Sequence, residues 1–588
     1  MQQTPDSIAL GLLGLLALCL PSSALATIQD PAALERGLDS VSVEGLEADL
    51  SFIASDEMRG RDTPSNEQRI AARFLRERVQ RLGFDSGGRY GFISEYHLSF
   101  LQLDSEASHL TVGETRLVFG RHYVFSRMND MGDLTTEGDL LSIGEGRVSD
   151  LRKNALKGKW AVCQSTGKSM RRLIREVTDA GAIGLLILPQ DGDDVLARHK
   201  RNVDSMKVGR LMKYQPVEFP TLTMTASGAQ TLLAACGLDE LPDLGKSLRA
   251  EASEVRRITD PRGHRYFENV IAFWPGSDPE LSKEVIIISA HYDHVGVRGG
   301  NVYNGADDNG SGTVGVLGIA DALAAYGPMQ RSVALIWVSA EEKGLLGSRC
   351  WTQRPWLSAG CRPIANINID MIGRNAPDEI LITPTKNGSV SKHYNGLVRL
   401  IESFGKQEGF RRFKSADDYW RRSDHMNFAD NLGLPVTFLF ADVHKDYHKH
   451  TDEVHLIDFD KMRRVVRMVL RALDAMQAPP LEISAKPAPS QEAFEAQMRR
   501  GMVADDLERW RLIADHYQRA SGKYPRNLSE LMRSEVLLES GLGRPGLERD
   551  PWGNMYELKS GDDGVLLTCE GSDGRKGGEG EAADTVVR

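Results

Sequence analysis

Histidine and carboxylate side chains follow several apolar runs in the second half of the chain. His291 and Asp293 come directly after the run EVIIISA, Glu341 and Glu342 come after SVALIWVSA, and Asp370 comes after PIANINI. Imidazole and carboxylate groups without thiolates suit zinc, or a similar divalent ion, in a catalytic rather than a structural site. This pattern therefore indicates a catalytic metal centre.

Two further segments supply side chains of the same kinds. Asp307 and Asp308 lie in the glycine-rich turn NGADDNGSG, and Tyr447 and His448 lie in the loop after LPVTFLF. One ligand from each of these five segments makes five, which exceeds what one zinc ion needs. Two ions about 3.5 to 4 Å apart that share one carboxylate would use all five ligands. The sequence therefore predicts a two-metal site, with His450 as an alternative to His448.

Neighbouring residues offer the supporting roles that such a site needs. Asp293 lies two residues beyond His291 and is placed to accept the second ring proton of that imidazole, which fixes its tautomer. In the pair Glu341-Glu342, one carboxylate can bind metal while its neighbour takes a proton from water. The pair thus predicts one ligand and one general base.

The elements that carry these residues alternate between strands and helices. The expected strands are near-continuous apolar runs, as in strands buried on both faces: ENVIAFW, EVIIISA, SVALIWVS, PIANINI and LPVTFLF. We expect an α/β fold with a mixed, mostly parallel sheet flanked by helices, an α/β/α sandwich. Sites in such folds lie beyond the carboxyl ends of the strands, so the sheet should gather these side chains at one edge.

Composition narrows the function further. The chain has 588 residues, 41% hydrophobic and 26% charged, as in ordinary folded, water-soluble proteins. Its formal net charge is −10, with no dominant basic stripe, which argues against binding to nucleic acid. Six scattered cysteines do not make a disulfide scaffold, and whether Cys350 pairs with Cys361 is left open by the sequence.

The N-terminus carries an apolar run from Ile8 to Leu20, shorter than the about 20 residues of a membrane helix. A small-residue site at Ala24-Leu25-Ala26 follows, which predicts a signal peptide cleaved before Thr27, although no Lys or Arg precedes the run. We therefore expect no stable membrane span and export to the periplasm or the medium of a Gram-negative bacterium.

Six motifs in order resemble those of the co-catalytic zinc exopeptidases, which include bacterial leucyl-type aminopeptidases and glutamate carboxypeptidase. They are HYDHVG (291–296), GADDNGSG (305–312), SAEEKGLLGS (339–348), NIDMIGR (368–374), SDHMNF (423–428) and YHKHTDE (447–453). The resemblance implies two zinc ions and hydrolysis at the ends of peptides or proteins, most readily as an aminopeptidase.

The same resemblance implies a role for each residue. One zinc would be held by His291 and Asp370 and the other by Glu342 and His448, with Asp307 as the bridge. Glu341 would be the general base, and Tyr447 would help to hold the oxyanion. Asp293 would orient His291, and Asp308 would follow the bridge in a cis Asp-Asp peptide bond.

Other segments resemble further families. We expect a signal peptide at 1–26, the first part of the peptidase domain at 27–110, a protease-associated insert at 111–255, the catalytic domain at 256–477, a linker at 478–496 and a C-terminal domain at 497–588. The last resembles the major pseudopilin of type II secretion through GKYP, DPWGNMY and its acidic end. That resemblance implies calcium at Ser572, Asp573 and Asp584 and contact with the secretion machinery.

Alternatives to an aminopeptidase stay open. Arg421 and Arg422, which with Asp424 and His425 form a candidate substrate pocket, would suit a carboxylate and thus a carboxypeptidase. A single-zinc enzyme like glutaminyl cyclase is a second alternative. A noncatalytic binding or secretion component is a third, from a different class of protein, and retention of every ligand argues against it.

Overall fold

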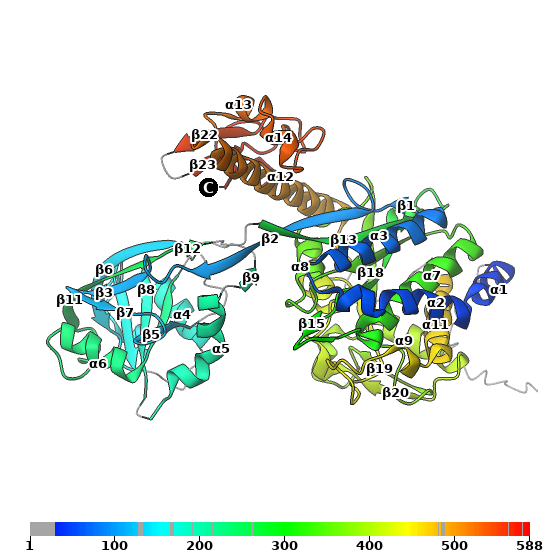
Figure 1. The fold of residues 1–588 in the computed structure, drawn as a ribbon, viewed down its shortest axis with the longest axis horizontal. Helices are drawn as coiled ribbons and strands as arrows, with labels where there is room; N and C mark the ends of the chain where they lie inside the picture. The colour runs from blue at the N-terminus through cyan, green and yellow to red at the C-terminus, as the bar shows by residue number, and fades with distance from the viewer. Residues whose placement is uncertain are drawn as a thin grey trace, which may run out of the picture.

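The structure is a computed structural model, and it describes residues 30–587 apart from short internal gaps. These gaps are 127–132, 165–169, 191, 209, 213–216, 218, 260–263, 480, 482, 484–487, 562–563 and 579. The predicted signal peptide lies outside the described residues. Among those residues, no helix is both long enough and apolar enough to cross a bilayer. Figure 1 shows three units along the chain.

The catalytic unit is built on a large mixed sheet. Its central strands are parallel and run in the order β17 (Ser332–Val338), β14 (Glu284–His291), β18 (Arg362–Ile369) and β21 (Val436–Phe440). Beyond β17, the sheet continues with the antiparallel strands β13 (His264–Trp274) and β2 (Ile93–Leu103). Beyond β21, it continues with the antiparallel strand β19 (Glu379–Thr383), and β20 (Arg412–Ser415) pairs parallel to β19. Short strands β1 (Asp85–Ser86), β9 (Arg210–Met212) and β12 (Ile258–Thr259) complete it. The expected mixed α/β sheet is confirmed, but its parallel pairings are confined to the four central strands and to β19 with β20, so the sheet as a whole is not mostly parallel.

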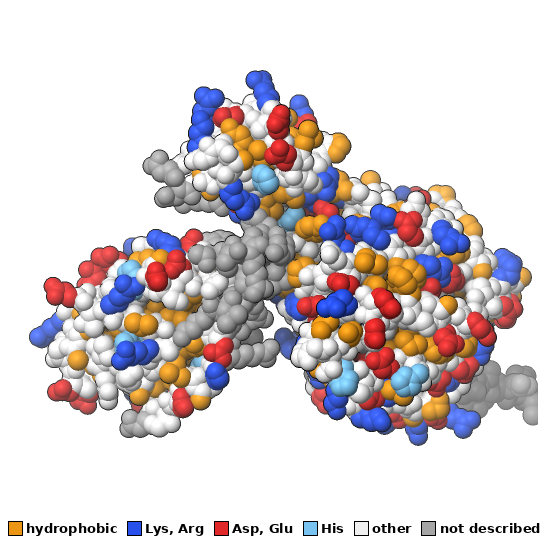
Figure 2. All heavy atoms as spheres, in the orientation of Figure 1, with side chains coloured by type: hydrophobic (Ala, Val, Ile, Leu, Met, Phe, Trp, Pro, Cys, Tyr) orange, Lys and Arg blue, Asp and Glu red, His pale blue; other side chains and the backbone are white. Residues whose placement is uncertain are grey.

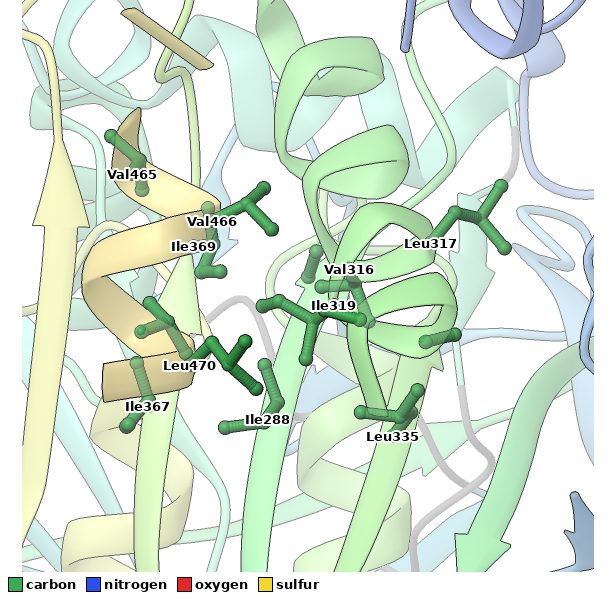
Figure 3. Packing of buried hydrophobic residues seen from close by; sticks show 14 of the residues in the cluster. Ile288, Val316, Leu317, Ile319, Leu335, Ile367, Ile369, Val465, Val466 and Leu470 are labelled. Atoms are coloured by element: carbon green, nitrogen blue, oxygen red, sulfur yellow. The ribbon is translucent and has the colours of Figure 1, made fainter. Parts of the chain in front are cut away.

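Helices cover both faces of this sheet, because alternate residues of the buried strands point to opposite sides. Ile286 and Ile288 pack with α7 (Gly312–Tyr326) and α11 (Phe459–Ala475). Figure 3 shows Ile319 and Leu470 of these helices lying over the strands. The same face carries α1 (Pro31–Ser40), α2 (Val43–Ile53), α3 (Asn66–Arg81) and α9 (Gly396–Gln407).

The opposite face forms a second cluster. Val285 and Ile287, one residue out of phase with the first set, pack with Trp351 of α8 (Leu346–Gln353) and Phe428 of α10 (His425–Leu432). The small hairpin of β15 (Val297–Arg298) and β16 (Asn301–Val302) lies in the loop after His291. The chain thus forms the expected three layers of helices, sheet and helices.

A separate eight-stranded sheet is inserted between β2 and β13. Its order is β4 (Thr115–Leu117), β3 (His109–Val112), β11 (Ser247–Arg256), β6 (Leu134–Ser142), β7 (Trp160–Gln164), β8 (Gly184–Leu188), β10 (Thr221–Met224) and β5 (Tyr123–Phe125). Helices α4 (Met170–Asp179), α5 (Val195–Val208) and α6 (Ala226–Ala235) pack against it. This sheet has its own apolar cores, at the left of Figure 1.

The C-terminal unit is led by the 31-residue helix α12 (Gln491–Ser521). Short helices α13 (Leu528–Met532) and α14 (Val536–Glu539) follow, then the three-stranded sheet of β22 (Glu557–Gly561), β23 (Gly564–Cys569) and β24 (Thr585–Val587). The start of α12 joins the catalytic core through Phe494, whereas Trp510 packs in the core of the C-terminal unit. One helix therefore belongs to both units.

No disulfide is present among the described cysteines. Cys350 lies in α8 and Cys361 lies just before β18, and the structure does not join them. The question that the sequence left open about this pair is thus answered in favour of two thiols.

Candidate metal centre

The parallel strands deliver the candidate ligands to one edge of the catalytic sheet. His291 is the last residue of β14 and pairs in register with Val338, the last residue of β17. Glu341 and Glu342 follow β17, and Asp370 directly follows β18. Since these strands run parallel, their carboxyl ends meet as expected.

The first group of possible ligands consists of His291, Asp308 and Asp370, all buried. The Nε2 atom of His291 lies 3.5 Å from Oδ1 of Asp308 and 3.4 Å from Oδ1 of Asp370. One imidazole nitrogen thus faces two carboxylate oxygens, which is a geometry that a divalent cation can fill.

The second group consists of His294, Asp308 and Glu342, with His448 beside it. The Oε1 atom of Glu342 lies 3.1 Å from Nδ1 of His294 and 3.2 Å from Nε2 of His448. The same His448 nitrogen is 3.0 Å from Oδ2 of Asp308. Asp308 therefore contributes one oxygen to each group and lies between them.

This position of Asp308 corrects the prediction that Asp307 is the bridge. The Oδ1 atom of Asp307 accepts hydrogen bonds from Ser311 Oγ (2.9 Å) and from the main-chain N–H of Gly373 (2.7 Å), so this side chain points into the turn. The cis peptide bond likewise joins Asp308 to Asn309, not Asp307 to Asp308. Both assignments from the motif were displaced by one residue.

His294 was missed by the sequence analysis, although it stands in the quoted motif HYDHVG. Its side chain is fully buried, and neither ring nitrogen forms a hydrogen bond among the described residues. Its ring meets that of His448 edge-on, with centroids 5.8 Å apart. The available signal was a second imidazole three residues after His291, on the same strand-end loop.

Buried polar atoms at the centre test whether the site suits a metal. Oδ2 of Asp308, Oε1 of Glu342, Oδ1 of Asp370 and both ring nitrogens of His294 make no hydrogen bond within the described part of the chain. Buried polar atoms without a hydrogen-bond partner cost free energy, and buried carboxylates that face each other need a cation. The residues present therefore fit a divalent metal pair.

Asp452 holds the backbone of the turn that carries Asp308. Asp452 is buried, and its carboxylate accepts hydrogen bonds from the main-chain N–H groups of Asp307 (3.0 Å) and Asp308 (3.1 Å). Burial, together with the neighbouring charge of Asp307, raises the pKa of Asp452 to about 7. Asp452 thus fixes the backbone from which Asp308 reaches the centre.

Asp293 lies next to His291 as predicted, but it makes different contacts. The Nδ1 atom of His291 is 3.1 Å from the main-chain oxygen of Asp293 and 3.7 Å from its carboxylate Oδ1. That Oδ1 instead accepts a hydrogen bond from the main-chain N–H of Glu341 (3.1 Å). Asp293 therefore links the imidazole loop to the loop of the predicted base.

Glu341 has the environment of a proton acceptor. Burial raises the pKa of its carboxyl well above the usual value, and the nearby charges of Asp424 and Glu342 raise it further, whereas His291 opposes them. A buried carboxyl with a raised pKa holds a proton more readily than an exposed one. These properties agree with the role of general base.

Tyr447 lines the same cavity as Glu341. Its ring stacks on His448 with centroids 4.0 Å apart, and its hydroxyl accepts a hydrogen bond from Nη2 of Arg422 (3.1 Å). Burial raises the pKa of Tyr447, so the hydroxyl keeps its proton and remains a donor. This position agrees with the predicted contact to an oxyanion.

The predicted substrate pocket is only partly correct. A small cavity of about 30 Å³ adjoins the centre, and Arg422 lines it, whereas Arg421 is exposed and does not. Asp424 is buried and accepts a hydrogen bond from Ser348. His425 is stacked on Phe438 (4.6 Å), and burial lowers its pKa to about 3. Both lie behind the cavity wall because α10 packs into the core.

Aromatic side chains that the sequence analysis did not name form that wall. Tyr419, Phe438 and Phe440 line the cavity beside the centre, together with Met371 and Val443. Phe438 and Phe440 are alternate residues of β21, so their side chains share one face of the strand. One side of the space next to the metal ligands is therefore lined by aromatic and apolar side chains.

Comparison with known proteins agrees with this geometry. Residues 269–473 match the model of peptidase family M28. The chain is 32% identical to leupeptin-inactivating enzyme 1 of Streptomyces exfoliatus over 184 residues, covering 31% of this chain and 37% of that protein. It is 29% identical to a probable leucine aminopeptidase of Trichophyton verrucosum over 218 residues, covering 34% and 55%. The chain thus spans less than two thirds of these relatives.

Solved structures are similar as well. An aminopeptidase from Aneurinibacillus sp. strain AM-1 has a TM-score of 0.43 at 19% identity and covers 77% of this chain and 98% of its own. A zinc aminopeptidase from Bacillus subtilis has a TM-score of 0.39 at 19% identity, covering 76% and 98%. The matched segment contains every proposed ligand.

Proposed function

We propose that this protein is an exported zinc-dependent exopeptidase, and specifically an aminopeptidase. One observation carries the proposal: Asp308 lies between two groups of buried ligands, with Glu341 beside them at the same edge of the sheet. The match of residues 269–473 to peptidase family M28 and the probable leucine aminopeptidases among the relatives support it.

The residues divide into two sets of ligands. We assign His291, Asp370 and Asp308 to one zinc ion, and Asp308, Glu342, His448 and His294 to the other. When bound, such a pair polarises a carbonyl group and lowers the pKa of water. The number of ions and the ligand role of His294 are parts of the proposal.

The other side chains would move the proton and hold the substrate. Glu341 takes a proton from the attacking water and passes it to the leaving amine. The Tyr447 hydroxyl donates a hydrogen bond to the carbonyl oxygen as negative charge develops there. The walls formed by Tyr419, Phe438 and Phe440 exclude water and suit an apolar terminal side chain.

Arg422 favours a second candidate function. Its guanidinium lines the cavity and contacts Tyr447, so it could pair with the α-carboxylate of a peptide. In that case the enzyme would be a carboxypeptidase. An enzyme like glutaminyl cyclase would instead hold a single zinc, and metal analysis separates that case from a two-metal peptidase.

The remaining units carry proposals of their own. We propose that 1–26 is removed on export and that the insert at 111–255 acts as a protease-associated domain. We also propose that the linker, predicted at 478–496 but ended in the structure by the start of α12 at Gln491, leads to a pseudopilin-like domain that meets the type II secretion machinery. We also propose calcium at Ser572, Asp573 and Asp584. Asp573 and Asp584 each accept a main-chain hydrogen bond in one turn region, which supports this site.

One experiment separates the functions. Residues 27–588, loaded with zinc, are incubated with matched peptides that are free or blocked at each end, and products are followed by mass spectrometry. Stepwise loss from free N-termini, absent in Glu341→Gln, is expected. Loss from C-termini would establish the carboxypeptidase instead. No turnover of any peptide by zinc-loaded protein would favour a binding protein.

A further inference from the structure

A cavity that shares no residue with the ligand groups lies where the catalytic unit meets the C-terminal unit. Its volume is about 500 Å³, and it is lined by Arg73 and Arg76 of α3, by Glu95 of β2, and by Arg509 and Arg544 of the C-terminal unit. Figure 2 shows Lys and Arg side chains gathered over α3 beside that unit. Four guanidinium groups, two from α3 and two from the C-terminal unit, thus line one space.

Carboxylates pair closely with three of these arginines, namely Arg73, Arg76 and Arg544, and leave Arg509 without a close carboxylate. Among the lining residues that the structure describes, Glu95 is the one carboxylate. Its Oε2 accepts a hydrogen bond from Nη2 of Arg544 (2.9 Å) and lies 3.9 Å from Nη1 of Arg509. Arg73 is paired with Glu268, which does not line the cavity. With Glu77 as the partner of Arg76, three carboxylates face four arginines, so one positive charge is left over, at Arg509.

Arg509 indicates which class of ligand would bind in this cavity. Its side chain is 6% exposed, and its Nη1 has no hydrogen-bond acceptor within the described residues. A buried guanidinium N–H without an acceptor costs free energy, and an oxyanion would remove this cost. The nearby Arg76 is 35% exposed and its hydrogen-bond partner is the adjacent Glu77, so it can turn toward a ligand.

We propose that this cavity is a binding site for a small multivalent oxyanion, with phosphate or carboxylate groups. The forked guanidinium groups match both kinds of anion in two-point contacts. Phe92 and Ile93 add a half-buried apolar wall, which suits a ligand with a short carbon body. Because the arginines come from two units, the bound anion would tie the C-terminal unit to α3.

Binding is tested on the full chain with probes that bind zinc weakly. Inorganic phosphate, sulfate and glutarate are titrated by calorimetry, and the unfolding midpoint is followed against sodium chloride of equal ionic strength. We expect saturable binding and a higher midpoint than in chloride. Comparison of phosphate with glutarate identifies the preferred anion.

Variants locate the binding. Arg76→Gln should weaken it about tenfold or more, since one charged hydrogen bond is lost. Arg509→Lys, which keeps the charge but loses the fork, should weaken it as well. Arg533→Gln, an exposed arginine of the same unit, should leave the affinity within about twofold.

Two results would overturn the proposal. The first is a midpoint that rises no more in phosphate or glutarate than in chloride. The second is binding that is equally strong in Arg76→Gln and Arg509→Lys, which would place the anion elsewhere, such as at the metal centre. Circular dichroism of each variant shows whether it is folded, and Arg76→Gln removes a hydrogen bond to the adjacent Glu77.

Discussion

The guanidinium of Arg61 donates a hydrogen bond from Nε to the main-chain oxygen of Tyr292 at 2.8 Å, directly between His291 and Asp293 in sequence. Arg61 is fully buried, and its other nitrogens donate to the carbonyl oxygens of Ile53 (2.8 Å), Asn304 (2.6 Å) and Gly305 (3.1 Å). Burial lowers its pKa to about 10, so it remains charged at neutral pH. The Arg61 guanidinium thus joins the loop that follows His291 to the segment just before Asp307.

Removal of the Arg61 guanidinium should destabilise the protein and weaken its binding of zinc. Arg61→Met would leave buried carbonyl groups without donors, so we expect the free energy of unfolding to fall by about 2 to 4 kcal/mol. Zinc content after dialysis should fall in parallel, as measured by atomic emission. Arg59→Met, at a side chain that is 58% exposed, is the control. Unchanged zinc retention in Arg61→Met would contradict this role of Arg61.

Glu341→Gln should abolish proton transfer and leave binding intact. The amide cannot act as a base, so kcat should fall about 10²- to 10⁴-fold with little change in KM. Zinc content should equal that of the wild type, because Glu341 is not among the assigned ligands. Loss of zinc together with activity would show that this residue is a ligand and not the base.

The shared carboxylate can be identified by a matched pair of variants. Asp308→Asn should lower the zinc content of the purified protein, because one side chain serves both ligand groups. Asp307→Asn should retain its zinc, since an amide oxygen still accepts the hydrogen bonds from Ser311 and Gly373. Zinc loss in Asp307→Asn alone would restore the assignment made from the motif.

His294 should matter to one metal position only. In His294→Gln we expect about 10- to 100-fold weaker binding of one of two metal ions, measured by competition with a chelator. Cobalt substituted at the centre should show an altered visible spectrum for that ion, since an imidazole nitrogen is lost. Two ions bound with unchanged affinity would assign His294 to packing alone.

Lys461 gives the catalytic unit a specific dependence on pH. It is fully buried, its Nζ donates to the carbonyl oxygens of Arg374 (2.6 Å) and Ala376 (3.0 Å), and burial lowers its pKa from 10.5 to about 8. The unfolded chain then binds this proton more tightly than the folded chain. The contribution of Lys461 to stability therefore rises from about pH 8 to about pH 10.5.

A variant isolates this contribution. Between these pH values, the free energy of unfolding of the wild type should increase relative to that of Lys461→Met by on the order of 3 kcal/mol. Urea unfolding of both proteins across the range measures the difference. Parallel curves for the two proteins would mean that the folded-state pKa of Lys461 is close to its ordinary value.

The sequence predicted the sheet and the place of the site well, for a clear reason. Strands buried on both faces are continuous apolar runs, and their parallel order brings the residues after them together, as found for His291 and Asp370. Adjacent residues in a turn are different. Spacing alone could not decide whether Asp307 or Asp308 faces the centre, because the direction of each side chain depends on the local backbone.

Long-range contacts explain the other differences. Arg61 donates to residues more than 230 positions away, which no local pattern reveals. His425 resembles a pocket residue by its motif, yet its ring packs between Trp420 and Phe438. The aromatic wall from β21 was equally hidden, since apolar strand residues look alike whether they face the core or a cavity.

The paired strands β2 and β13 have one more consequence. Ser99 pairs with His264 and Ile93 pairs with Val270, so the chain leaves the catalytic sheet and returns to it on neighbouring strands, about 4.8 Å apart. Topologically, everything between them is the loop of a single hairpin. A short turn could therefore replace the inserted sheet without rethreading the rest of the fold, and modules of other shapes could be exchanged there while the metal ligands stay in register.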